Sequence, residues 1–175
     1  DPQFYDPETG LFFRDDADIG FRILDAGYKA IQPPDVVAWH PVQFPSVNKS
    51  FQHVKRYMFD PLLYRKHPRY FRAYIERKKF FGISLRRPMH YSSLVFVLSV
   101  LTLCLSAALG AVLLTWLSVM LALAAHIIFR YKFQGWSALK FWRQRETAAY
   151  VILPFVYLYW FVHGIRRFGG WKSIF

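Results

Sequence analysis

Three aspartates that could do chemistry stand close together near the start of the sequence, at Asp15, Asp16 and Asp18. In the first turn of a helix, carboxylates are stabilised by the free amide groups, so all three could simply cap a helix. Neighbouring carboxylates also raise one another's affinity for a proton, and one of them could then act as a general base. The residue types alone leave both interpretations open.

The residues that follow predict the helix that would carry this acidic cluster. Asp6 to Gly10 has the composition of a turn, and Ile19, Ile23 and Leu24 repeat at helical spacing behind the aspartates. Gly27 can end such a helix in the left-handed conformation. We therefore expect a turn, a short helix and a glycine stop.

Two β runs are expected after this helix, over residues 28–31 and 36–39, with Pro33 and Pro34 between them. The second run delivers His40 at its end. A structural role for this histidine and a metal-binding role are both open. Residues 1–53 are thus expected to form a mixed α/β unit.

Charge divides the chain into two unlike parts. Residues 1–53 hold four Lys or Arg and eight Asp or Glu, net −4, whereas residues 54–175 hold nineteen and three, net +16. Since 54% of all residues are hydrophobic, this balance suits a protein that touches a membrane. A nucleic-acid-binding protein is the weaker interpretation, because apolar stretches beside the basic one make lipid the expected partner.

The stretch from Tyr91 to Phe129 holds 39 residues without one Lys, Arg, Asp or Glu. As a single helix it would be about 58 Å long, nearly twice the roughly 30 Å hydrocarbon core of a bilayer. We therefore expect a transmembrane hairpin over residues 91–129 that turns near Gly110. Basic flanks at 54–90 and 130–146 would both be cytoplasmic under the positive-inside rule.

The segments beside this hairpin are expected to meet the membrane surface. Within residues 54–90, Pro68 can begin a helix whose shared face holds Phe71, Tyr74, Ile75 and Lys78, either on anionic lipid headgroups or as an ordinary solvated surface. Residues 147–175 contain an apolar stretch, interrupted by Pro154 and followed by a basic tail. A third span is preferred there, with a re-entrant or interfacial helix as the alternative.

The run FRDDADIGFRILDAGYKAIQPPDVVAWH, residues 13–40, resembles the end of the catalytic domain in family 2 glycosyltransferases. In that family an acidic pair and a further acid open a helix, and an arginine, a glycine and a strand-terminal histidine follow. An aspartate replaces the usual glutamate at the first position, and the resemblance continues loosely through residues 64–68. The counterparts in this chain are Asp15, Asp16, Asp18, Arg22, Gly27 and His40.

This resemblance implies an α/β catalytic-domain fragment of GT-A type followed by an α-helical membrane domain of two to three spans. The implied reaction is inverting transfer of a sugar from a nucleotide sugar to a lipid-linked or polysaccharide acceptor, at the cytoplasmic face of the cell membrane. The implied catalytic residues are Asp16, Asp15 and Asp18, with Asp16 as the base, and His40 would help hold Mg²⁺ or Mn²⁺. Arg22 and Gly27 would support the motif.

Two further expectations come with the resemblance. The donor-binding half and its D-x-D metal motif are expected upstream of Asp1, so the chain alone is expected to be inactive. Gln52, Lys55 and Arg56 match degenerately a Q-x-x-R-W motif that meets the acceptor or the diphosphate, although they also suit an ordinary amphipathic helix surface. The alternative function is a non-catalytic membrane anchor or transporter subunit, which leaves the acidic cluster unexplained.

Overall fold

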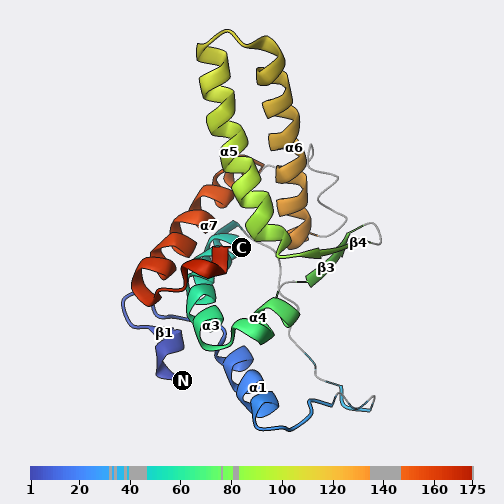
Figure 1. Cartoon of the computed structure of the whole chain (residues 1–175), viewed down its shortest axis with the longest axis vertical. Coiled ribbons are helices and arrows are strands. Elements are labelled where there is room, and N and C mark those ends of the chain that lie inside the picture. Colours follow the sequence, from blue (N-terminus) through green and yellow to red (C-terminus); the bar gives the residue numbers. More distant parts are fainter. Residues whose placement is uncertain are drawn as a thin grey trace.

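The chain is mostly helical, and a long helical hairpin rises from a group of other helices that contains both termini (Figure 1). Its paired strands are short and form two separate two-stranded hairpins. The computed structural model describes residues 1–31, 33, 35–37, 39, 47–75, 77–80, 83–134 and 147–174.

The amino-terminal elements follow the predicted order of turn, helix and glycine stop. Gly10 closes the turn with φ +64°, and Gly27 follows the helix with φ +85°, a backbone region that favours glycine. The expected turn and helix are therefore confirmed. The elements are η1 (Pro2–Phe4), the antiparallel pair β1 (Tyr5–Asp6) and β2 (Leu11–Phe12), and α1 (Asp15–Asp25).

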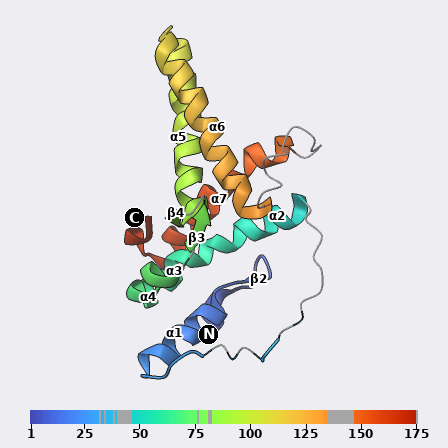
Figure 2. The same cartoon turned by 90° about the vertical axis from the view of Figure 1, so that its right-hand side faces the viewer.

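A continuous helical run crosses the middle of the molecule between α1 and the long hairpin (Figure 2). Pro68 begins the last helix of the run directly after His67, as the sequence predicts. The apolar residues of this run bury against the amino-terminal elements in one core that includes Phe4, Phe59 and Leu63. The run consists of α2 (Val47–Lys55), η2 (Arg56–Phe59), α3 (Asp60–Lys66) and α4 (Pro68–Tyr74).

The helix that begins at Pro68 is shorter than expected. It ends at Tyr74, because Ile75 adopts an extended conformation and β3 (Arg77–Phe80) then pairs with β4 (Ile83–Arg86). The expected shared face is divided: Phe71 and Ile75 are buried, Tyr74 is 61% exposed, and Lys78 lies in a strand. The predicted single amphipathic face is wrong at these positions.

The described residues do not form the expected α/β unit. No strand is present at 28–31, nor at the described residues 36, 37 and 39 of the second expected run. A strand needs a neighbour for its backbone N–H and C=O groups, and no described segment pairs with these residues. The acidic cluster is carried by a helix that packs on other helices.

The expected hairpin is present as α5 (Pro88–Ala108) and α6 (Val112–Gln134), which pack along each other (Figure 1). Gly110 joins them with φ +68°. Both are long and apolar enough to cross a membrane. Within the described residues, only 28% of the most apolar stretch of α5 and 22% of that of α6 are buried. The apolar side chains that point outward therefore need lipid or another apolar cover.

The base of the hairpin is fixed by Arg87, which is fully buried and precedes α5 with φ +47°. Its guanidinium donates to the carbonyl of Ser173 and lies 5.2 Å from the ring centroid of Phe71 and 5.4 Å from that of Phe161. Arg87 thus ties the hairpin to α4, to α7 (Thr147–Phe168) and to η4 (Trp171–Ile174).

The third apolar stretch forms α7, with Pro154 inside it. Among the described residues, α5 and α6 are the helices that combine length and apolar character sufficient for a span, so the preferred third span is not supported. One face of α7 packs instead on α2, η2 and α3. The approach is close enough that a Cβ on Gly164 would overlap the backbone carbonyl of Met58.

This close approach predicts that Gly164→Ala destabilises the protein by about 1–3 kcal/mol, because the new methyl group forces α7 away from η2. The measurement is the thermal unfolding midpoint of the purified protein in detergent. Gly20→Ala is the matched control: a Cβ there meets nothing within 4 Å, and alanine is the better helix former. Equal midpoints for the two variants would contradict the described packing.

Candidate functional site

The acidic pair lies in the first turn of α1 and faces outward. Asp15 and Asp16 are exposed, and the backbone N–H of Ala17 donates to Asp16 Oδ1 at 2.7 Å. The residue before them, Arg14, has φ +74°, so the chain turns sharply into the helix. Two carboxylates are thereby presented at the amino-terminal end of a helix, where the free amides favour negative charge.

Asp18 differs from this pair because it is completely buried. The Nε2 atom of His67 lies 3.0 Å from Asp18 Oδ1, and Lys66 Nζ lies 3.6 Å from the same oxygen. Arg22 Nε, one helical turn later, lies 3.4 Å from Oδ2. This carboxylate is held by three basic side chains and anchors α1, so the environment of Asp18 differs from that of the other two predicted catalytic residues, Asp15 and Asp16.

Arg14 supplies a second anchor on the other side of the pair. Its Nε donates to Asp60 Oδ1 at 2.8 Å, and the Asp60 side chain is fully buried at the start of α3. The guanidinium also lies over the Phe13 ring at 4.3 Å. Arg14 and Asp18 therefore fix the chain immediately before and after the exposed pair.

The inner face of α1 completes the attachment. Phe21 stacks on Tyr70 of α4 at 5.3 Å between centroids and meets His67 edge-on at 5.5 Å. His67 Nδ1 lies 3.5 Å from Asp25 Oδ2, so this one ring faces carboxylates seven residues apart on α1. Burial and a hydrogen bond with Asp25 raise the pKa of the Tyr70 hydroxyl.

A shallow groove of about 530 Å³ runs beside α1. Its walls are mostly apolar, and its nearest residue to the acidic pair is Ala17. An apolar or sugar-ring surface could lie against such walls, within reach of the first turn of α1. The groove is lined by Ala17, Gly20, Phe21, Leu24, Lys29, Ala30 and Tyr74.

The weaker candidates lie on other elements. Gln52 is exposed on α2, Lys55 Nζ lies 5.7 Å from the ring centroid of Trp160 in α7, and Arg56 begins η2. The acidic cluster lies instead on α1, which packs on α3 and, through Phe21 and Tyr70, on α4. Their predicted role at the acceptor or diphosphate stays a prediction.

The predicted metal ligand His40 lies outside the described residues. Within the described part of the chain, no three His, Cys, Asp or Glu side chains converge as a metal site. Arg22 and Gly27, predicted as motif support, occupy the expected places: Arg22 pairs with Asp18, and Gly27 follows α1.

Three participants could not be recognised as site residues in the sequence: Arg14, Asp60 and His67. Arg14 and Asp60 are 46 residues apart, and Asp18 and His67 are 49 apart. No local spacing connects such positions. The one available signal is that His67 lies inside the 64–68 run of the family resemblance.

No family model matches this chain, and neither a curated protein nor a solved structure matches it. The resemblance in residues 13–40 therefore rests on the order of the quoted residues.

A further ion pair joins the amino-terminal hairpin to the end of α7. Arg167 donates to Asp6 Oδ1 at 2.6 Å, and Thr9 donates to the other oxygen. Burial would raise the pKa of the Asp6 carboxyl, but the hydrogen bonds from Thr9 and Arg167, with the Arg167 charge, outweigh it and hold the pKa below its ordinary value of 3.8. This contact therefore stabilises the fold while Asp6 is ionised.

The sign of this pKa shift fixes the pH dependence of the contact. Stabilisation by Asp6 is complete above about pH 4 and is lost as the pH falls through the lowered pKa. Arg167→Gln should cost about 1–2 kcal/mol near neutral pH, discounted because the arginine is 34% exposed, and less at pH 3, which lies below the ordinary pKa of 3.8. Thermal unfolding at both pH values measures this, with exposed Arg166→Gln as control. An equal loss at both pH values would contradict it.

Proposed function

We propose that the full-length protein transfers a sugar from a nucleotide sugar to a lipid-linked or polysaccharide acceptor, with Asp16 as the general base. The observation that carries this proposal is the difference in environment among the three aspartates of the acidic cluster. Asp18 is committed to a buried ion-pair network, whereas Asp15 and Asp16 are exposed in the first turn of α1. The order of residues 13–40, which resembles family 2 glycosyltransferases, supports the same assignment.

The proposed step needs a base because an alcohol is a poor nucleophile until its proton is removed. The Asp16 carboxylate accepts the proton of the acceptor hydroxyl as that oxygen bonds to the anomeric carbon. The bond from that carbon to the diphosphate oxygen breaks, and the nucleoside diphosphate leaves with its electron pair. Attack from the opposite side inverts the anomeric configuration.

The rest of the reaction depends on groups outside the described residues. Family resemblance implies a divalent metal, Mg²⁺ or Mn²⁺, that would neutralise charge on the leaving diphosphate, with His40 among its ligands. The described residues form no such site, so no step is assigned through the metal. The role of this chain is to position Asp16 and to hold it at the membrane.

We place the hairpin of α5 and α6 across the cell membrane, with the acidic cluster on the cytoplasmic side. The apolar exposed surface of both helices supports this location. Eleven Lys or Arg in residues 54–90 and the basic residues of 130–146 support the orientation. A reaction centre beside the inner leaflet suits a soluble donor and a lipid-linked acceptor.

The proposal predicts that Asp16→Asn lowers sugar-transfer turnover by roughly 10²–10⁴-fold in the full-length protein, while donor affinity is kept. The amide preserves the shape of the side chain but removes the proton acceptor. Exposed Asp15→Asn is the matched control and should lose far less. Transfer rate and donor binding are measured for both variants.

Two results separate this function from its alternatives. If Asp16→Asn transfers sugar at the wild-type rate, Asp16 is not the base and the pair is only a helix cap. If the folded wild-type protein binds no nucleotide sugar and transfers none, the non-catalytic anchor replaces the enzyme. Asp18→Asn does not serve this test, because removing a buried charge partner costs about 3–5 kcal/mol of stability.

A further inference from the structure

Helix α7 has two apolar faces, and the part of the chain that the structure describes covers one of them. The covered face packs on α2, η2 and α3 and includes Tyr157, Phe161 and Gly164. The opposite face is exposed over more than three turns and carries no charged residue until Arg166. Its members are Val151, Ile152, Phe155, Tyr159 and Val162, which are between 38% and 65% exposed.

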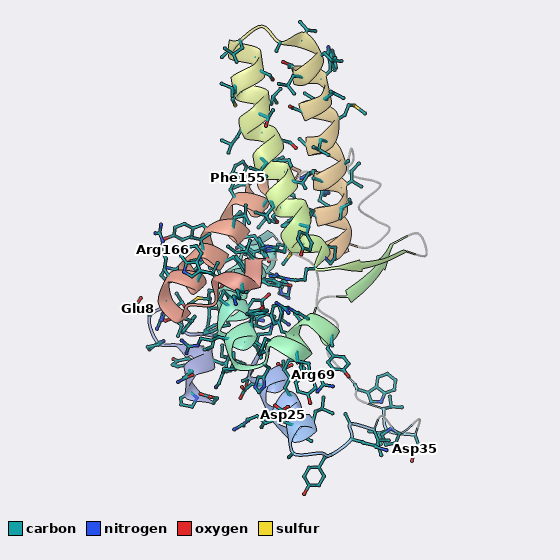
Figure 3. The ribbon with its side chains drawn as sticks, in the orientation of Figure 1. Glu8, Asp25, Asp35, Arg69, Phe155 and Arg166 are labelled. Carbon is teal, nitrogen blue, oxygen red and sulfur yellow. The ribbon has the colours of Figure 1, made fainter. Side chains whose placement is uncertain are left out.

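This uncovered face is continuous with the outer surface of the long hairpin. The ring of Phe155 meets the ring of Phe96 on α5 edge-on, with 5.9 Å between centroids. Both views show α7 running obliquely past the base of the hairpin (Figures 1 and 2). Figure 3 shows Phe155 in the part of α7 that passes α5, and Arg166 farther along the helix, away from the hairpin. Phe96 is buried at this contact and Phe155 is itself 39% exposed, so the exposed face of α7 lies directly beside its contact with α5.

The far end of the same face changes from apolar to basic and aromatic. Arg166 follows Val162 by one turn, and a shallow pocket of about 300 Å³ opens beside it. Trp171 and Lys172 are exposed in the next element, η4. Aromatic and basic side chains gather at the headgroup level of membranes. The pocket is lined by Leu158, Tyr159, Val162, His163 and Arg166.

The contacts of α7 favour a helix at the membrane surface over a helix that spans the membrane. A spanning α7 would have to withdraw its other face from η2 and α3, where Gly164 touches the backbone of Met58. A helix in water would leave its apolar turns uncovered beside a lipid-covered hairpin. An oblique position at the membrane surface satisfies both faces at once.

We propose that the outer face of α7 is a bilayer-docking surface, and that the pocket at Arg166 binds the phosphate of an anionic phospholipid in the cytoplasmic leaflet. The inference rests on the proposed membrane location of α5 and α6. It adds a contact that holds α1 near the leaflet, since the opposite face of α7 packs on η2 and α3, and α3 packs on α1.

Single cysteines in the whole chain test the docking surface, in a Cys104→Ser background. Phe155→Cys and Val162→Cys carry the fluorophore NBD in nanodiscs that contain nitroxide-labelled lipid. Leu98→Cys on α5 reports the hairpin, and Tyr28→Cys, which is 70% exposed beyond α1, reports solvent. All four positions are exposed in the protein, so the substitutions leave the core intact.

The proposal predicts strong quenching at 155, 162 and 98, weak quenching at 28, and slow reaction of the unlabelled 155 and 162 thiols with a membrane-impermeant reagent. Reaction as fast as at 28, without quenching, overturns it. Protection without quenching also overturns it, because a protein or a second copy would then cover the face. If 98 is unquenched as well, the membrane location under the proposed function fails too.

A second experiment in the same nanodiscs tests the phosphate pocket. Val162→Cys should be quenched several-fold more by trace headgroup-labelled phosphatidylglycerol than by labelled phosphatidylcholine. Arg166→Gln should remove this preference, whereas Arg69→Gln, at an exposed arginine of α4, should keep it. Equal quenching by the two lipids in the parent protein, or a preference that survives Arg166→Gln, overturns the phosphate site.

Discussion

The Asp18 carboxylate is a negative charge without solvent contact, and the placement of α1 depends on how that charge is balanced. Removing such a charge from water costs several kcal/mol unless close opposite charges and hydrogen bonds compensate. Here the compensation comes from His67 and Lys66 at the junction of α3 and α4, and from Arg22 on α1 itself. If α1 shifts, the carboxylate loses His67 and Lys66 together, so the helix has one well-defined position.

This constraint explains how an exposed acidic pair can be held rigidly. Within the described residues, the hydrogen bond of the pair is a local one, from the Ala17 amide to Asp16. Its position comes from Arg14 on one side, paired with buried Asp60, and from Asp18 on the other. Groups that react with a substrate must be exposed to it and held in a fixed geometry. The neighbouring residues fix the geometry of the pair and leave it exposed.

Close packing and buried ion pairs also connect the acidic cluster to the long hairpin. The helices that hold α1 also pack on α7, closely enough at Gly164 to exclude a side chain. Arg87 joins α4 and α7 to the base of the hairpin, and Asp6 joins the amino-terminal turn to Arg167. A series of buried charges and close backbone contacts therefore connects the candidate site to the helices proposed to cross the bilayer.

Local and periodic features of this fold were predictable from the sequence, whereas pairings over long distances were not. The helix after the aspartates, the left-handed Gly27 and the hairpin turn at Gly110 follow from capping, glycine geometry and apolar length. The partners of Asp18 and Arg14 lie more than 40 residues away and leave no periodic signal. The expected strand at 28–31 was wrong because no described neighbour pairs with it.

The central claim, that a buried charge anchor fixes the helix bearing Asp16, is tested most directly by a double-mutant cycle. Asp18→Asn, His67→Gln and the double variant are compared with the parent by free energy of unfolding in detergent. The account predicts a coupling energy of at least about 1 kcal/mol, because the two groups compensate each other in a buried site. Losses that add within roughly 0.3 kcal/mol would show that the pair does not hold α1, and would contradict the account.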